Sequence, residues 1–95
     1  MATLLSAVSS DGAGTALDYD QPRLLNIRGT FDDCIVYIEF SDDGGTTYTP
    51  TDKRFTSPDH GILDLGAGTF KVRAVVDDAG GSTSITATLG GSATW

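Results

Sequence analysis

The residues of this 95-residue chain that could do chemistry are one histidine, one cysteine and several paired aspartates. His60 lies in a proline-containing loop with Ser57. A Ser-His-Asp arrangement would have to be built from Ser57, His60 and a nearby acid within that one loop, and loop solvation explains these residues better. We therefore predict no catalytic residues and no enzymatic activity.

The single cysteine, Cys34, cannot form an internal disulfide, so no oxidising compartment is implied. It has no basic or histidine neighbour in sequence that would lower its pKa, and it opens a predicted strand, where a buried thiol packs like a small apolar residue. The sequence contains no metal-ligand set of Cys and His and no glycine loop that could hold a phosphate. No cofactor is predicted.

Three aspartate pairs, Asp32-Asp33, Asp42-Asp43 and Asp77-Asp78, each lie in a predicted loop. Calcium binds oxygen ligands, so the first and third pairs are candidates if their loops share one end of the fold. None of the pairs has the alternating D-x-D-x-D spacing of a dedicated calcium loop. Because Asp is also the usual turn residue, a turn role is the favoured alternative.

The net charge of −7 repels phosphate backbones, so nucleic acid is not an expected partner. The N-terminus lacks a basic region followed by an apolar run, and no stretch approaches the ~20 apolar residues of a membrane span. Neither secretion by signal peptide nor membrane insertion is expected.

Odd-even spacing of apolar residues predicts the elements that must position these groups. Val36, Ile38 and Phe40 alternate with polar neighbours, and the same pattern recurs over 70–77 and 84–89. The Asp-Gly run 42–45 then reverses the chain. No segment has helical spacing, so we predict one all-β domain over residues 1–95, built as two packed antiparallel sheets.

The remaining segments have weaker patterns. We expect a first strand within 3–9, a turn-rich connection over 10–19, a strand just after Pro22 with Leu25 and Ile27 inward, a short edge strand at 53–55 and a loop over 56–61. A strand is then expected near Leu63, followed by a glycine corner at 66–68.

Leu63-x-Leu65-Gly-Ala-Gly-Thr-Phe70-x-Val72-x-Ala74 resembles the late strands of immunoglobulin-like domains. The resemblance implies an immunoglobulin-like antiparallel β-sandwich of about seven strands. Phe70 stands where such domains often have a tyrosine whose hydroxyl ties down the corner, so that hydrogen bond is expected to be missing.

Residues 41–48, Ser-Asp-Asp-Gly-Gly-Thr-Thr-Tyr, resemble the Asp-box hairpin, S-x-D-x-G-x-T-W, with Tyr48 in the Trp place. Asp-boxes recur in sialidase propellers, in turns away from the catalytic centre. One copy in a chain of this length cannot be a propeller, so the resemblance implies a structural turn.

The same kind of hairpin, in a small acidic Gly/Thr-rich chain, is similar to β-sandwich proteins of tailed bacteriophage virions. The resemblance implies a capsid decoration, or cement, protein, made in the host cytoplasm and placed on the outer capsid surface. Its partners would be the major capsid protein and copies of itself, as a dimer or trimer. Tail, neck and fibre components share the sandwich and remain alternatives.

The segments expected to contact a partner are the two ends of the chain, 1–9 and 90–95. The residues that we expect to make these contacts are Leu4, Leu5, Tyr37 and Trp95. A tail folded back on its own sandwich is the alternative for Trp95. A host-surface glycan-binding module is the rival function, and it would use Tyr19, Tyr37 and Tyr48 as exposed aromatics.

Overall fold

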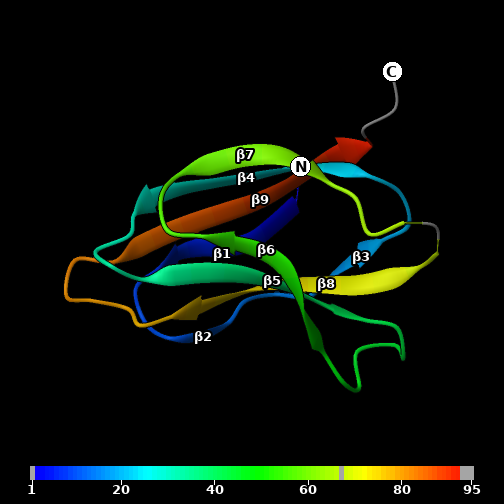
Figure 1. Ribbon diagram of the computed structural model, residues 1–95, viewed down its shortest axis with the longest axis horizontal. Helices are drawn as coiled ribbons and strands as arrows, with labels where there is room; N and C mark the ends of the chain where they lie inside the picture. The colour runs from blue at the N-terminus through cyan, green and yellow to red at the C-terminus, as the bar shows by residue number, and fades with distance from the viewer. Residues whose placement is uncertain (1, 67, 93–95) are drawn as a thin grey trace.

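The computed structural model describes residues 2–66 and 68–92, which form nine strands in two antiparallel sheets (Figure 1). Sheet A has the order β1-β9-β4-β7, and sheet B has the order β2-β8-β5-β6, with β3 also pairing with β8. The strands are β1 (Ala2–Val8), β2 (Gly12–Ala13), β3 (Leu17–Tyr19), β4 (Arg23–Thr30), β5 (Ile35–Ser41), β6 (Thr49–Phe55), β7 (Asp59–Leu63), β8 (Phe70–Asp77) and β9 (Ser84–Ser92). The predicted all-β antiparallel sandwich is confirmed.

The strands pair in a nested order. If β2 and β3 are counted as one interrupted strand, the first strand pairs with the last (β1 with β9), the second with β8, the third with β7 and the fourth with β6. This order, closed by β4 against β9 and β5 against β8, is that of a jelly roll. Immunoglobulin domains instead pair their last two strands in one sheet, whereas β8 and β9 lie in opposite sheets. The immunoglobulin-like strand order is therefore corrected to a jelly roll.

Alternating side chains of the central strands fill the interior, as their spacing predicts. Within sheet B, Val36 and Ile38 of β5 lie opposite Val76 and Ala74 of β8, and Val72 of β8 is buried beside them. Sheet A supplies the other half of one continuous apolar core, with inward side chains from β4 and β9: Leu25, Ile27, Ile85, Ala87 and Leu89. Burial of each large aliphatic side chain contributes about 1.5–3 kcal/mol.

The N-terminal segment is part of the sandwich and not a free arm. β1 pairs with β9, and Leu4 and Leu5 are 1% and 2% exposed. Both consecutive side chains point inward because the pairing shifts register on either side of Leu5, as at a β-bulge. Leu4 and Leu5 are therefore core residues, which corrects their expected role as partner contacts.

Two predicted loops contain strands. The connection over 10–19 holds β2 and β3, and the loop over 56–61 holds the start of β7. Between β2 and β3, the Gly14 amide donates to the Ala74 carbonyl of sheet B (2.8 Å) and the Thr15 amide donates to the Leu4 carbonyl of sheet A (3.0 Å). These two bonds close one side of the sandwich. Ala67, in the expected glycine corner, lies outside the described residues.

The corner before β8 is tied by a hydroxyl after all. Tyr19 pairs with Phe70 across β3 and β8, with ring centroids 6.0 Å apart, and it is fully buried. Its hydroxyl accepts a hydrogen bond from the Leu65 amide at 2.8 Å. Phe70 itself makes no such bond, as expected, but Tyr19 on the neighbouring strand supplies a hydroxyl that ties the corner in its place.

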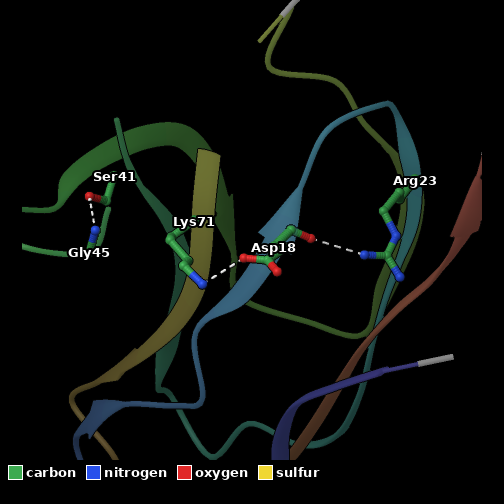
Figure 2. A network of polar contacts seen from close by, with 5 residues as sticks. All are labelled: Asp18, Arg23, Ser41, Gly45 and Lys71. Atoms are coloured by element: carbon green, nitrogen blue, oxygen red, sulfur yellow. Dashed lines mark hydrogen bonds and ion pairs between the residues drawn. The ribbon is translucent and has the colours of Figure 1, made fainter. Parts of the chain in front are cut away.

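Arg23 joins the two sheets at the same end of the sandwich, and Figure 2 shows its contact with Asp18. From β4 in sheet A, its guanidinium donates to the Asp18 carbonyl of β3 in sheet B (3.1 Å) and to the Gly90 carbonyl of β9 (2.6 Å). The Asp18 carboxylate in turn pairs with Lys71 of β8 at 2.6 Å. The end that carries Tyr19 is thus crossed by polar bonds between the sheets.

Replacing Tyr19 with Phe tests the corner. The change leaves the buried ring in place but removes the acceptor of the Leu65 amide, so we expect a loss of about 1 kcal/mol of unfolding free energy, or about 4–8 °C in melting temperature. Thermal unfolding followed by circular dichroism measures it. Tyr37→Phe is the control, because the Tyr37 hydroxyl bonds none of the described residues; an equal effect of both changes would contradict the role of Tyr19.

Candidate functional site

The turn between β5 and β6 is organised by one carboxylate. Asp43 accepts hydrogen bonds from the Ser41 hydroxyl (2.6 Å), the Thr46 amide (3.1 Å) and the Thr47 amide (2.9 Å), and a further bond from the Thr47 hydroxyl. The Ser41 hydroxyl oxygen also accepts the Gly45 amide at 2.9 Å (Figure 2). Gly44 and Gly45 have positive φ angles, which glycine adopts without strain. The Asp-box-like residues therefore do form a hydrogen-bonded turn.

The hydrogen bonds to Asp43 stabilise its charged form. The bond from Ser41, followed by those from Thr47, holds the pKa of the Asp43 carboxyl far below its usual range. The Asp43 carboxylate consequently stays charged at a pH low enough to protonate a free aspartate side chain. Every strong interaction of Asp43 is made within its own turn, so its role is structural.

Tyr48 follows this turn and joins it to the outer face of sheet B. The Arg73 guanidinium stacks over the Tyr48 ring, 3.8 Å from its centroid, and donates to the Glu39 carboxylate at 2.7 Å. Cation–π and ion-pair contacts thus hold Tyr48 against β5 and β8. Tyr48 is a packed residue and not a free aromatic for a ligand.

Tyr37 lies beside a polar hollow on the outer face of sheet B. A shallow cavity of about 230 Å³ on the outer face of sheet B is lined by Tyr37, Pro50, Thr51, Arg54 and Asp77. The Arg54 guanidinium lies 5.8 Å from the Tyr37 ring centroid. An aromatic face, a cation and a carboxylate converge here, so this is the candidate binding site.

The sequence identified Tyr37 but not its companions. Arg54 lies opposite Tyr37 across β5 and β6, and Asp77 lies diagonally from it on β8, opposite Ile35. The turn chemistry of 41–48 indicated that the two strands pair, but the register shift between Tyr37 and Glu39 decides which β6 residue faces Tyr37. Alternation alone does not reveal that shift.

A second hollow of about 200 Å³ lies between the edge strands β6 and β7. Lys53 and Phe55 line one side, Asp59 to Leu63 line the other, and Leu25 forms part of the floor. This side of the sandwich is open, in contrast to the side closed by Gly14 and Thr15. His60 is exposed here on β7 and makes no hydrogen bond to Ser57, so the structure does not bring the two together as a catalytic pair.

The acidic loops at the other end of the sandwich meet as expected, and the carboxylates of Asp32 and Asp77 accept hydrogen bonds from backbone amides there. The Asp32 carboxylate accepts the Ser82 amide at 2.8 Å, which places the first and third aspartate loops side by side. Asp32 and Asp33 both have positive φ, and the Cys34 amide donates to the Phe31 carbonyl, which are the features of a type I′ turn. Asp77 accepts the amide of Asp78 (3.0 Å).

No group of three acidic, histidine or cysteine side chains in the described part of the chain is arranged to hold a metal ion. The positive φ angles of Asp32, Asp33 and Asp78, and the amides that bond Asp32 and Asp77, assign these candidate calcium ligands to turns. Cys34 is buried next to this end, and burial raises the pKa of its thiol, as expected for a packing residue.

The aromatic and terminal residues that were expected to contact a partner lie in different places. Tyr37 is half-buried at the candidate site, whereas Tyr19 is buried in the core and is removed from the set of candidate glycan contacts. Trp95 lies outside the described residues. Of the expected arm 90–95, residues 90–92 belong to β9, where Ser92 pairs with Arg23.

Comparisons with protein-family models, with curated proteins and with solved structures gave no match to this chain. Among the residues described, there is no helix with the length and apolar character needed to cross a membrane. The candidate site is therefore interpreted from its own geometry.

Replacing Asp43 with Asn tests the turn and its pH dependence. The hydrogen bonds to charged Asp43 make its pKa lower in the folded state than in the unfolded state, where it is about 4. They therefore stabilise the protein fully above about pH 4. This stabilisation is lost as the pH falls toward the folded-state pKa. We expect Asp43→Asn to lower the melting temperature by a constant amount from pH 7 to about pH 4 and by progressively less below it. The neighbour Asp42, which bonds none of the described residues by its side chain, provides the control Asp42→Asn; a deficit of Asp43→Asn that grows below pH 4 would contradict the assignment.

Proposed function

We propose that this protein is a non-catalytic structural component of a tailed-phage virion, a decoration protein that binds the outer surface of the major capsid shell. The observation that carries the proposal is the strand order, since jelly rolls are typical of viral capsid and lectin domains. This is an analogy of fold.

The molecule has the features that such a role requires. Its core is complete within one small domain, and its acidic turns lie on the surface, where the net charge of −7 keeps coated particles dispersed. A small domain offers only a modest interface to the shell. Repetition over many equivalent shell positions makes modest interfaces sufficient, because bound copies stabilise the shell together.

The proposal predicts a fixed stoichiometry on the particle. Virions purified on a density gradient should contain this chain at a constant ratio to the major capsid protein, and antibodies against it should label the head in electron micrographs. Purified protein added to heads that lack it should bind saturably and raise the melting temperature of the shell. Labelling confined to the tail or neck would favour those alternatives, and a chain absent from the particle would contradict a virion role.

A glycan-binding module is the second candidate, and the cavity at Tyr37 is the observation that favours it. Sugar rings pack their apolar faces on aromatic rings while their hydroxyls bond charged side chains, and Tyr37, Arg54 and Asp77 offer both kinds of contact. The small volume of the cavity fits one sugar residue of a longer chain.

A glycan array with the Tyr37→Ala variant tests this candidate. We expect any specific binding by the wild-type protein to fall by at least about tenfold when the Tyr37 ring is removed. Tyr48→Phe, which keeps the ring stacked under Arg73, should bind as the wild-type protein does. No binding by the wild-type protein, or equal binding by Tyr37→Ala, would exclude the cavity as a glycan site.

A further inference from the structure

Three of the four sheet edges in the described part of the chain carry features that discourage pairing with another chain. β6 contains Pro50, Lys53 and Arg54 and has a register shift against β5. β1 has two register shifts and a positive φ angle at Ala7. The edge formed by β2 and β3 is interrupted between Ala13 and Leu17. Charges, prolines and irregular backbone are the usual protection of free edges.

The fourth edge, β7, has little of this protection, since Asp59 is the one formally charged residue in it. Asp59 to Leu63 pair with β4 in five consecutive positions without a register shift, and the segment contains no proline, lysine or arginine. Its residues from Asp59 to Ile62 are exposed, and the strand lies at the upper edge of the view in Figure 1. A regular, exposed edge of this kind presents unpaired backbone groups to another strand.

The same edge carries exposed apolar side chains. Leu24 and Ile62 are the large apolar side chains that stand exposed among the described residues, at 44% and 41%. They are direct cross-strand partners on the outer face of sheet A. We call Leu24 and Ile62 the apolar pair; it ends at the edge of the sheet, with Ile62 outermost.

We propose that two copies of this chain associate edge to edge through β7, antiparallel, with the two-fold axis at Ile62. In this register Ile62 lies opposite Ile62 of the second copy, and the two apolar pairs form one row of four side chains across a continuous eight-stranded sheet. The register also places His60 opposite Asp64 of the second copy, twice, by symmetry. Both side chains are exposed, so each can form a cross-strand polar pair.

Charge favours this antiparallel arrangement. A chain of net charge −7 repels its own copies, and a parallel alignment would place the two Asp59 side chains next to each other. About the proposed axis the Asp59 residues are six positions apart, or about 20 Å, which exceeds the Debye length of about 8 Å at physiological salt. The edge is self-complementary in its apolar surface and in the polar pairing of His60 with Asp64, which is why a second copy is its occupant.

The interface is small. A five-residue strand buries less than the roughly 1,000 Å² typical of stable complexes, so we expect a weak dimer whose population rises with concentration. The inference does not depend on the proposed virion role, and it is tested on the isolated protein.

Cysteine cross-linking distinguishes the proposed register from other contacts. Ile62→Cys places two thiols across the axis within disulfide distance, whereas Leu24→Cys, equally exposed, places them three strand spacings or about 14 Å apart. Under mild oxidation we expect Ile62→Cys to form covalent dimers at least about tenfold faster than Leu24→Cys. The wild-type chain is the blank, because Cys34 is buried.

Sedimentation equilibrium measures the association itself. The wild-type protein should show a reversible monomer–dimer equilibrium, and Ile62→Asp should raise the dimer dissociation constant by at least about tenfold, since it places two like charges on the axis. Unchanged circular dichroism melting confirms that the variants fold. The proposal would be overturned by a wild-type chain that stays monomeric at every concentration, or by equal cross-linking of both cysteine variants. Binding of a different protein to this edge would not rescue it.

Discussion

The Asp43 carboxylate is the constraint on which the rest of the structure depends. It fixes the reversal between β5 and β6, which is the innermost pair of a nested fold. The pairs outside it join segments that are progressively farther apart in sequence, ending with Ala2 against Leu89. Long-range pairing is entropically costly, so a turn that orders itself with local hydrogen bonds reduces what the outer pairs must overcome. The most specific motif of the sequence, residues 41–48, lies in this turn.

The acidic composition of the chain also follows from the role of aspartate in turns. The carboxylates of Asp11, Asp32 and Asp64 each accept a hydrogen bond from a backbone amide of a turn or loop. Asp also tolerates the positive φ angles found at Asp32, Asp33 and Asp78. The aspartates thus stabilise the connections of a fold with many tight reversals. The negative surface is a consequence of this turn chemistry, and it need not imply a cation as ligand.

The spacing of apolar residues predicted which side chains are buried, but not which strands pair with each other. Alternation correctly assigned Val36, Ile38 and the inward residues of β8 and β9, because it reports which side of a strand is buried. It carries no information on which strands pair, so the same pattern suited an immunoglobulin-like order and a jelly roll. Tyr19 was missed for a related reason: its strand has three residues, too few to show a period. The candidate site at Tyr37 depends on a register shift, and it could not be derived from one strand alone.

The surfaces available for binding include the sheet edges that are not covered within the sandwich. The nested order places β6 and β7 at the same open side, one edge for each sheet, because the connection between them is short and crosses from sheet to sheet. The opposite side is closed by backbone bonds from Gly14 and Thr15. Of the two open edges, β6 carries the proline and both cations, whereas β7 has Asp59 as its one formal charge, so β7 is the edge open to pairing. The exposed apolar pair lies at the β7 edge and not at the β6 edge. This is the arrangement expected if β6 stays solvated and β7 is used for association.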